Sequence, residues 1–202
     1  HKLGISRIND FLIDYNIESL SNLSLTIRKS SEILLKNKIF ELKNGTYEYS
    51  LNIDGYFDIV TLKAKITISD YNIHVDYTGT SNQTNKASIN CVYNVTHSST
   101  MYPFKCALVP RIPNNTGLFN PIRVFAKKGS ILNTTFPHPV QARAKTTNNI
   151  NQVIFGALDD VFGKYSQAGS GSIWPFSVFG KDDDGKNFSC HILPHGGRGA
   201  MK

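Results

Sequence analysis

The amino-acid sequence predicts an α+β fold in which an antiparallel sheet is covered by helices. Three observations support this class. Apolar residues recur at helical spacing over residues 5–40, they alternate with polar residues over residues 47–77, and helical spacing returns within residues 89–109 and 148–162. The 202 residues are 40% hydrophobic and 18% charged, so the chain can bury a sizeable core.

The first segment, residues 1–45, is predicted to be helical. One periodic run of apolar residues ends at Tyr15 and a second begins at Leu20, which indicates two helices broken near residues 15–18. A turn at Asn44-Gly45 ends the segment. We therefore expect a helical segment at 1–45 and a β-rich α+β core at 46–202.

The core is expected to begin with three antiparallel strands joined by short turns. The alternating stretches are residues 47–53, 59–68 and 73–77. Such a sheet has one apolar face, and the helices predicted within 89–109 and 148–162 would cover it. The proline-rich stretch between these helices is expected to form ordered loops, in which functional residues often lie.

A hairpin is predicted near the end of the chain, from residues 173–179 and 188–193. Its tip, Asp182-Asp183-Asp184-Gly185, resembles the start of a calcium loop but lacks the glutamate that closes such a loop, so a solvated tip is the better interpretation. Cys190, His191 and His195 are the densest group of soft metal ligands. Because a fourth ligand at a suitable spacing is missing, we predict no metal site there.

Composition and charge exclude several classes of protein. The net charge of +7 comes from basic residues scattered along the whole chain, so a nucleic-acid interface is not predicted. There is no apolar run long enough to span a membrane. The sparse, odd set of cysteines, Cys91, Cys106 and Cys190, favours a reducing, cytoplasmic location without disulfides. The chain opens without Met and stops just after a glycine turn, from which we expect a fragment or a processed piece.

Two common catalytic motifs are missing from the sequence. It contains neither the G-x-x-x-x-G-K-[ST] phosphate loop nor the G-x-S-x-G nucleophile motif. Residues 76–83 instead place a carboxylate, hydroxyl groups, a glycine and an amide at the end of a predicted strand. This cluster can bind a polar ligand, or it can form a hydrogen-bonded turn, which local chemistry alone favours.

The order of several short motifs resembles the hydantoinase B/5-oxoprolinase family. They are Asp76-Tyr77-Thr78-Gly79-Thr80-Ser81 with Gln83, Asn90 with Asn94-Val95-Thr96, Ile112-Pro113-Asn114-Asn115-Thr116-Gly117, Gly129-Ser130-Ile131-Leu132-Asn133, Pro137 to Val140, Ala142-Arg143, Gly156-Ala157-Leu158, and Gly196-Gly197-Arg198-Gly199-Ala200. The resemblance covers residues 76–200. Residues 1–75 fit the family only loosely.

The resemblance implies an enzyme part that works in a multisubunit complex. In this family an A-type partner binds ATP and activates a carbonyl oxygen, while the B-type part completes hydrolysis of a cyclic amide of the hydantoin or 5-oxoproline type. The alternative within the family is an ATP-dependent ketone carboxylase. A divalent metal is expected to be bound outside this segment, and the remaining part of the B-type polypeptide is an expected partner. The 202-residue piece alone is predicted to be inactive.

The resemblance also directs attention to particular residues. Asp76, His138 and Arg143 are the candidate catalytic residues, and the candidate substrate-binding residues are Thr78, Thr80, Ser81 and Asn90. Arg143 can clamp a carboxylate or an oxyanion with its planar guanidinium, and the imidazole of His138 can exchange a proton. A structural alternative remains open for each: a buried ion pair that anchors the loop for Arg143, and a hydrogen-bonded loop residue for His138. The strand end at Asp76 and the loop carrying His138 and Arg143 are expected to meet.

Two rival functions from other classes remain open at this stage. A non-catalytic assembly module would use the same fold only to hold a partner subunit. A secreted β-rich binding domain would explain the glycosylation sequons at Asn44, Asn94 and Asn187, although an Asn-rich chain produces such sequons by chance.

Overall fold

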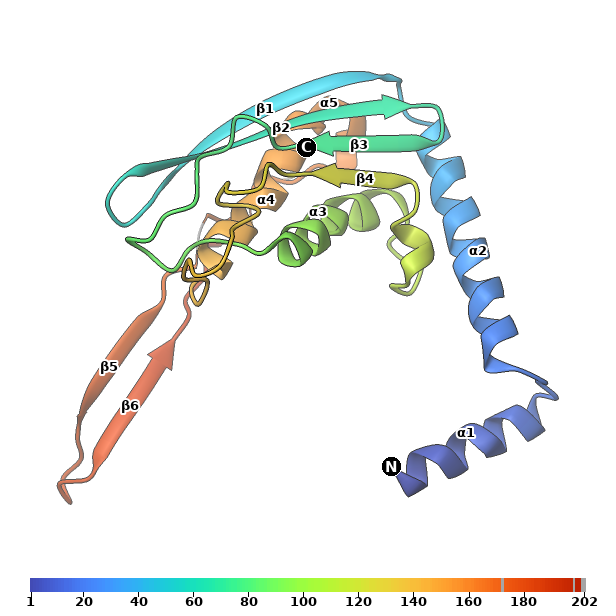
Figure 1. Cartoon of the computed structure of the whole chain (residues 1–202), viewed down its shortest axis with the longest axis horizontal. Helices are drawn as coiled ribbons and strands as arrows, with labels where there is room; N and C mark the ends of the chain where they lie inside the picture. Colours follow the sequence, from blue (N-terminus) through green and yellow to red (C-terminus); the bar gives the residue numbers. More distant parts are fainter. Residues whose placement is uncertain (172, 198, 201–202) are drawn as a thin grey trace.

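The computed structural model describes residues 1–171, 173–197 and 199–200. Within these residues, four strands form one sheet and the helices α3 and α4 lie across one of its faces (Figure 1). A helical arm leaves one end of this body and a two-stranded hairpin leaves the other. The α+β class and the helix-covered sheet predicted from the sequence are therefore confirmed.

The first three strands are antiparallel, as the alternation predicts. They are β1 Gly45–Asp54, β2 Ile59–Ser69 and β3 Asn72–Asp76. Leu62, Ala64 and Ile66 of β2 are fully buried on one face, because side chains two residues apart share a face of a strand. On the opposite face, the Glu48 carboxylate lies 3.2 Å from the Lys63 ammonium. We call these the inner face and the outer face.

A fourth strand, β4 Ile122–Phe125, was not predicted from the sequence. It pairs in parallel with β3, and Val124 lies opposite Val75. Because β4 has only 4 residues and follows Pro121, its alternation is too short to be recognised. The chain reaches it through α3, since a parallel pair needs a crossover connection. The sheet is therefore mixed, in the order β1-β2-β3-β4.

Two helices cover the inner face in the regions predicted for them. They are α3 Tyr93–Leu108 and α4 Ala144–Ala157, and the second is followed by α5 Asp159–Phe162 and the 3-10 turn η2 Gly163–Tyr165. Phe104 of α3 and Val153 of α4 are fully buried in the shared core. A methyl group added at Gly156 would lie 2.8 Å from the Tyr49 ring, so α4 approaches β1 closely.

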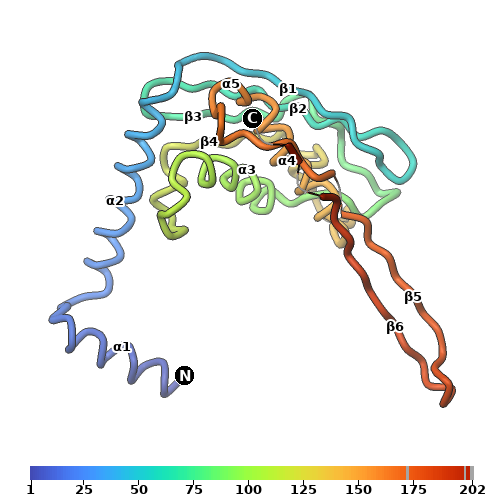
Figure 2. Tube along the Cα trace, turned by 180° about the vertical axis from the view of Figure 1, so that it is seen from behind, coloured from blue at the N-terminus to red at the C-terminus, as the bar shows by residue number. Residues whose placement is uncertain are grey.

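The N-terminal segment forms two helices, as predicted. They are α1 Lys2–Asp14 and α2 Leu20–Phe40, and Ser19 caps the second by accepting a hydrogen bond from the Ser21 amide at 3.2 Å. No residue of α1 is buried, whereas Leu35 and Ile39 bring the second half of α2 into the core. Figure 2 shows α1 and the start of α2 standing away from the sheet. The domain border at residues 45 and 46 stays a prediction.

The predicted hairpin is present near the end of the chain. Its strands are β5 Phe176–Lys181 and β6 Asn187–Ile192. At its tip, Asp182 Oδ1 accepts hydrogen bonds from the backbone amides of Asp184 and Lys186, and Gly185 adopts a φ of 77°. These contacts make the aspartate run a solvated turn. None of the helices in the described part of the chain is both long enough and apolar enough to cross a membrane.

Candidate functional site

The end of β3 carries a tight turn rather than an open cluster of free polar groups. Asp76 Oδ1 accepts hydrogen bonds from the Thr78 amide at 2.8 Å and from the Thr78 hydroxyl at 2.6 Å. Asp76 follows the buried Val75 and precedes the buried Tyr77, so it points to the outer face of the sheet. Asp76 and Thr78 therefore form the hydrogen-bonded turn that local chemistry favoured over a ligand-binding cluster.

Thr80 and Ser81 use their hydroxyl groups to fasten the chain beside β2. The Thr80 hydroxyl accepts from the Lys63 amide at 3.1 Å and donates to the Lys63 carbonyl at 3.2 Å. The Ser81 hydroxyl accepts from the Thr61 amide at 2.9 Å. These side chains continue the hydrogen bonding along β2 beyond the end of β3, and in this way they hold the motif loop against the sheet.

Asn90 joins the motif loop to the proline-rich loop. Its side chain is fully buried. Its Oδ1 accepts from the Thr84 amide at 2.8 Å, and its Nδ2 donates to the carbonyls of Thr84 at 2.7 Å and Pro139 at 2.8 Å. A second link is made by Gln83, whose Oε1 accepts from the Thr135 amide at 2.8 Å. The proline-rich loop therefore contacts the chain at Gln83 and Asn90, whereas the meeting was expected at the strand end around Asp76.

His138 and Arg143 lie in the same loop region, but Asp76 does not join them. His138 is half-buried, with Nδ1 2.9 Å from the Thr135 carbonyl. The Arg143 guanidinium is exposed and makes one long contact, 3.5 Å, to the Val140 carbonyl. Arg143 directly precedes α4, which covers the inner face, whereas Asp76 points to the outer face. No hydrogen bond or ion pair among the described residues connects the two, so the expected shared pocket is not found.

Cys91 lies under this junction and is fully buried. Burial raises the pKa of its thiol to about 12, and the nearby positive charge of Arg143 only partly opposes this effect. The thiolate is the reactive form, so Cys91 is protected both by its surroundings and by its protonation.

We expect Cys91 to resist alkylation in the folded protein at pH 8, while the exposed Cys190 reacts readily. Iodoacetamide labelling followed by peptide mass spectrometry measures both sites in one sample, and labelling in urea gives the reference for full access. Equal labelling rates of Cys91 and Cys190 in the folded protein would contradict the buried position.

His191, which was weighed as a metal ligand, has a different partner in the structure. Its Nδ1 lies 2.8 Å from the Ser177 hydroxyl across the hairpin. In the described part of the chain, no group of three or more His, Cys, Asp or Glu residues is arranged to hold a metal ion.

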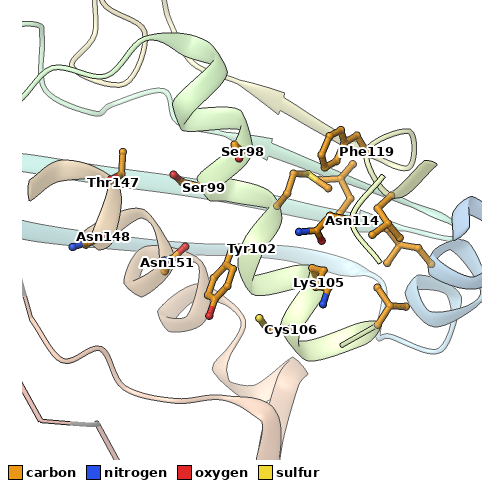
Figure 3. Close-up of a pocket in the computed structure, with 15 residues that line it drawn as sticks. Ser98, Ser99, Tyr102, Lys105, Cys106, Asn114, Phe119, Thr147, Asn148 and Asn151 are labelled. Atoms are coloured by element: carbon orange, nitrogen blue, oxygen red, sulfur yellow. The ribbon is translucent and has the colours of Figure 1, made fainter. Parts of the chain in front are cut away.

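A concave site lies on the helical side of the molecule, between α2, α3, α4 and the 3-10 turn η1 Thr116–Leu118 (Figure 3). Its volume is about 600 Å³, which is in the range of small-molecule sites. Leu35, Met101, Leu118 and Ile122 supply apolar walls. The polar lining residues are Ser98, Ser99, Tyr102, Lys105, Cys106, Asn114, Thr147, Asn148 and Asn151.

The chemistry of this cavity suits a neutral polar molecule. Its described lining contains no carboxylate, and the Lys105 ammonium already donates to the Pro110 carbonyl at 2.6 Å. A hydrogen bond with the Cys106 thiol raises the pKa of Tyr102, so the phenol stays a neutral donor and acceptor. Amide side chains and hydroxyl groups therefore dominate the polar contacts that a ligand would meet.

Sequence reasoning did not identify this cavity. The sequence signal that could have indicated it is the two-sided pattern of α3. One side of this helix lines the cavity with Ser98, Ser99, Tyr102 and Lys105. The other side is buried and carries Thr96, Thr100 and Phe104. The partners across the cavity come from α4, about fifty residues later in the chain. Only the fold brings the two sets together.

The I-P-x-N-x-G motif forms one wall of the cavity and fastens α2 to the body. Asn115 Nδ2 donates to the Ser31 hydroxyl at 2.8 Å, and Asn115 Oδ1 accepts from the Gly117 amide at 2.9 Å. Gly117 is buried against the backbone of α2, where an added methyl group would lie 2.0 Å from the Arg28 carbonyl oxygen. The motif therefore serves close packing between two backbones.

Two solved structures share this fold. The ATP-dependent caprolactamase of Pseudomonas jessenii superposes with a TM-score of 0.77 at 16% identity, over 93% of this chain and 33% of that chain. An acetone carboxylase in its nucleotide-free state superposes with a TM-score of 0.69 at 16% identity, over 83% of this chain and 26% of that chain. At such identities the likeness concerns the fold alone.

The sequence comparisons add the family. A protein of Pseudomonas sp. (strain NS671) that is named as the B-type subunit of a D-/L-hydantoinase is 24% identical over 196 residues, covering 91% of this chain and 33% of that protein. The chain thus spans about a third of the length of this relative. The family model described as hydantoinase B/oxoprolinase matches residues 1–202. Because this match extends over the whole chain, the protein belongs to the hydantoinase B/oxoprolinase family.

Proposed function

We propose that the chain is part of the B-type subunit of an ATP-dependent cyclic amide hydrolase. The observation that carries the proposal is the family match over residues 1–202, and the fold shared with an ATP-dependent caprolactamase supports it. The substrate class is a ring amide of the hydantoin, 5-oxoproline or lactam type. Such molecules carry a hydrogen-bond donor beside an acceptor in the ring amide, which agrees with the amide and hydroxyl side chains that line the cavity beside α3.

ATP is assigned to an A-type partner subunit, because the sequence lacks the phosphate loop. The described residues do not fit a divalent metal site, so any metal of the complex is assigned to residues outside this segment. The remaining part of the B-type polypeptide is a further partner. We also propose a cytoplasmic location, which the free cysteines support.

A ketone carboxylase is the second candidate, and the shared fold with acetone carboxylase favours it. Both reactions need an activated carbonyl oxygen, but they form different bonds. In the hydrolase, water attacks the amide carbonyl carbon, whereas in the carboxylase the carbon next to the ketone carbonyl attacks a carboxyl donor. A non-catalytic assembly module is the third candidate, supported by the structural hydrogen bonds of Thr80, Ser81 and Asn90.

The proposal is tested by supplying the partner. We expect the 202-residue chain alone to leave ATP, hydantoin, 5-oxoproline and caprolactam unchanged. The complete B-type polypeptide with an A-type subunit is expected to open one of these rings only when ATP is added. Chromatography of the ring-opened acid measures the product. Ring opening by the 202-residue chain without a partner would contradict the proposal that the reaction needs an A-type subunit and the rest of the B-type polypeptide.

The catalytic roles of Asp76, His138 and Arg143 stay predictions, and Arg143 offers the sharpest test. Its guanidinium is exposed, so Arg143→Lys is expected to change the free energy of unfolding by less than about 0.5 kcal/mol. Turnover by the complex is expected to fall at least about tenfold, because lysine keeps the charge but loses the planar two-pronged donor. Steady-state kinetics and thermal unfolding separate the outcomes. Unchanged turnover with unchanged stability would remove Arg143 from the site.

A further inference from the structure

The helix α1 presents an apolar stripe that nothing in the described structure covers. Ile5, Ile8, Phe11, Leu12 and Tyr15 recur at the spacing of one helical face. The exposed fractions of Ile5, Ile8 and Tyr15 are 61%, 46% and 70%. The rings of Phe11 and Tyr15 lie 4.9 Å apart along the same stripe. The polar residues Ser6 and Asp10 lie on the opposite side of the helix.

The hairpin of β5 and β6 has a similar uncovered face. The cross-strand pairs Phe176 with Ile192 and Val178 with Cys190 place apolar side chains on one side of the ribbon, where Phe188 also lies. The pairs Ser177 with His191 and Lys181 with Asn187 place polar side chains on the other face, where Phe179 is the apolar exception. No residue of either strand is buried.

Both arms extend to the same side of the sheet. Figures 1 and 2 show α1 and the hairpin reaching beyond α3, on the side where α3 and α4 cover the inner face. The cavity beside α3 lies between the bases of the two arms, since α2 forms one of its walls and α4 another. The arms therefore flank one continuous region of the surface.

Neither arm has the contacts that stabilise such elements. A helix of 13 residues is marginal in water without tertiary packing, and so is an isolated two-stranded hairpin. Uncovered apolar patches of this kind mark interaction sites, and strongly apolar ones are typical of permanent interfaces. A body that fills the region between the arms would cover both apolar faces at once.

We propose that α1 and the hairpin are two parts of one docking surface, and that its occupant is the remainder of the B-type polypeptide. This inference rests on the proposed function. The occupant follows from length: the matched region is 33% of the hydantoinase relative and 33% of the caprolactamase chain, so two thirds of each polypeptide lie outside it. A covalently linked occupant is present at high effective concentration and suits a permanent apolar interface. Once seated, it also closes the open side of the cavity.

Site-specific photo-crosslinking in the complete B-type polypeptide tests this docking surface. Ile8 and Val178 are replaced, one at a time, by p-benzoylphenylalanine, and Ser6 and Asn187 on the opposite faces serve as matched control positions. The probes at Ile8 and Val178 are expected to form crosslinks within one polypeptide, to residues outside the 202, several-fold more often than the controls. Peptide mass spectrometry identifies the partners.

The other outcomes overturn the proposal. Crosslinks between two copies would assign the surface to self-association, and crosslinks to an A-type subunit would assign it to the heteromeric interface. Equal crosslinking yields from both faces of an arm, or no crosslinks from either face, would show that the arm contacts no partner. Crosslinking does not depend on turnover, so these outcomes are distinguishable from a failure of the proposed enzyme activity.

Discussion

Replacing Asn90 by alanine is expected to lower the free energy of unfolding by about 2 to 4 kcal/mol. The substitution removes four hydrogen bonds at once, one of them a long contact of 3.5 Å to the Ala87 carbonyl, and leaves the Thr84 amide and the carbonyls of Thr84 and Pro139 without these partners in a part-buried site. Each buried polar group left unsatisfied costs on the order of 1 to 3 kcal/mol. Urea unfolding of the purified chain, followed by circular dichroism, measures the change.

A matched control comes from the same motif. Asn82 is exposed and its side chain makes no hydrogen bond in the described structure, so Asn82→Ala is expected to change stability by less than about 0.5 kcal/mol. Asn90→Asp keeps an acceptor for the Thr84 amide but places a carboxylate against two carbonyls, and is expected to be destabilising as well. If Asn90→Ala leaves stability unchanged and abolishes turnover in the complex, Asn90 binds substrate as the sequence suggested.

Replacing Gly117 by alanine is expected to cost about 2 to 3 kcal/mol, because the added methyl group has no room. It would meet the Arg28 carbonyl oxygen at 2.0 Å and its carbon at 2.8 Å, both of which are backbone atoms. The helix α2 must then move away from η1, and overpacking of this kind costs roughly 1 to 3 kcal/mol. Hydrogen exchange of the amides near Leu35 and Ile39 is expected to speed up together with the loss of stability.

Gly4→Ala is the control for the chemical change itself. Gly4 lies in α1 with nothing within 4 Å of the added methyl group. There the substitution is expected to be neutral or to favour the helix by up to about 1 kcal/mol. Equal effects at Gly4 and Gly117 would show that the close approach of α2 to η1 does not govern stability.

The elements with long periodic patterns could be predicted from the sequence. The alternation through Leu62, Ala64 and Ile66 fixed both the strand and its buried face, and the helical spacing through Val153 and Ile154 located α4. The short β4 escaped prediction because its pairing depends on β3, not on its own pattern. Its parallel direction follows from the crossover through α3, which only the folded chain reveals.

The candidate site was predictable only in part. The proline-rich loop does contact the motif segment, but through Gln83 and Asn90, for which no such contact was predicted. The expected partnership of Asp76 with Arg143 failed for a simple reason: a strand alternates its faces residue by residue, so Asp76 turns away from the side that α4 covers. The cavity beside α3 was missed because its walls come from four separate elements.

The central claim is that this chain serves an ATP-dependent opening of cyclic amides. The most direct measurement is the stoichiometry of the reconstituted complex, in which ADP and the ring-opened product are quantified together in the presence of labelled bicarbonate. We expect ADP and ring-opened acid in equal amounts, with no label in the product. Incorporation of label into a ketone, with no ring opening of any amide tested, would contradict the claim and assign the chain to the carboxylase branch.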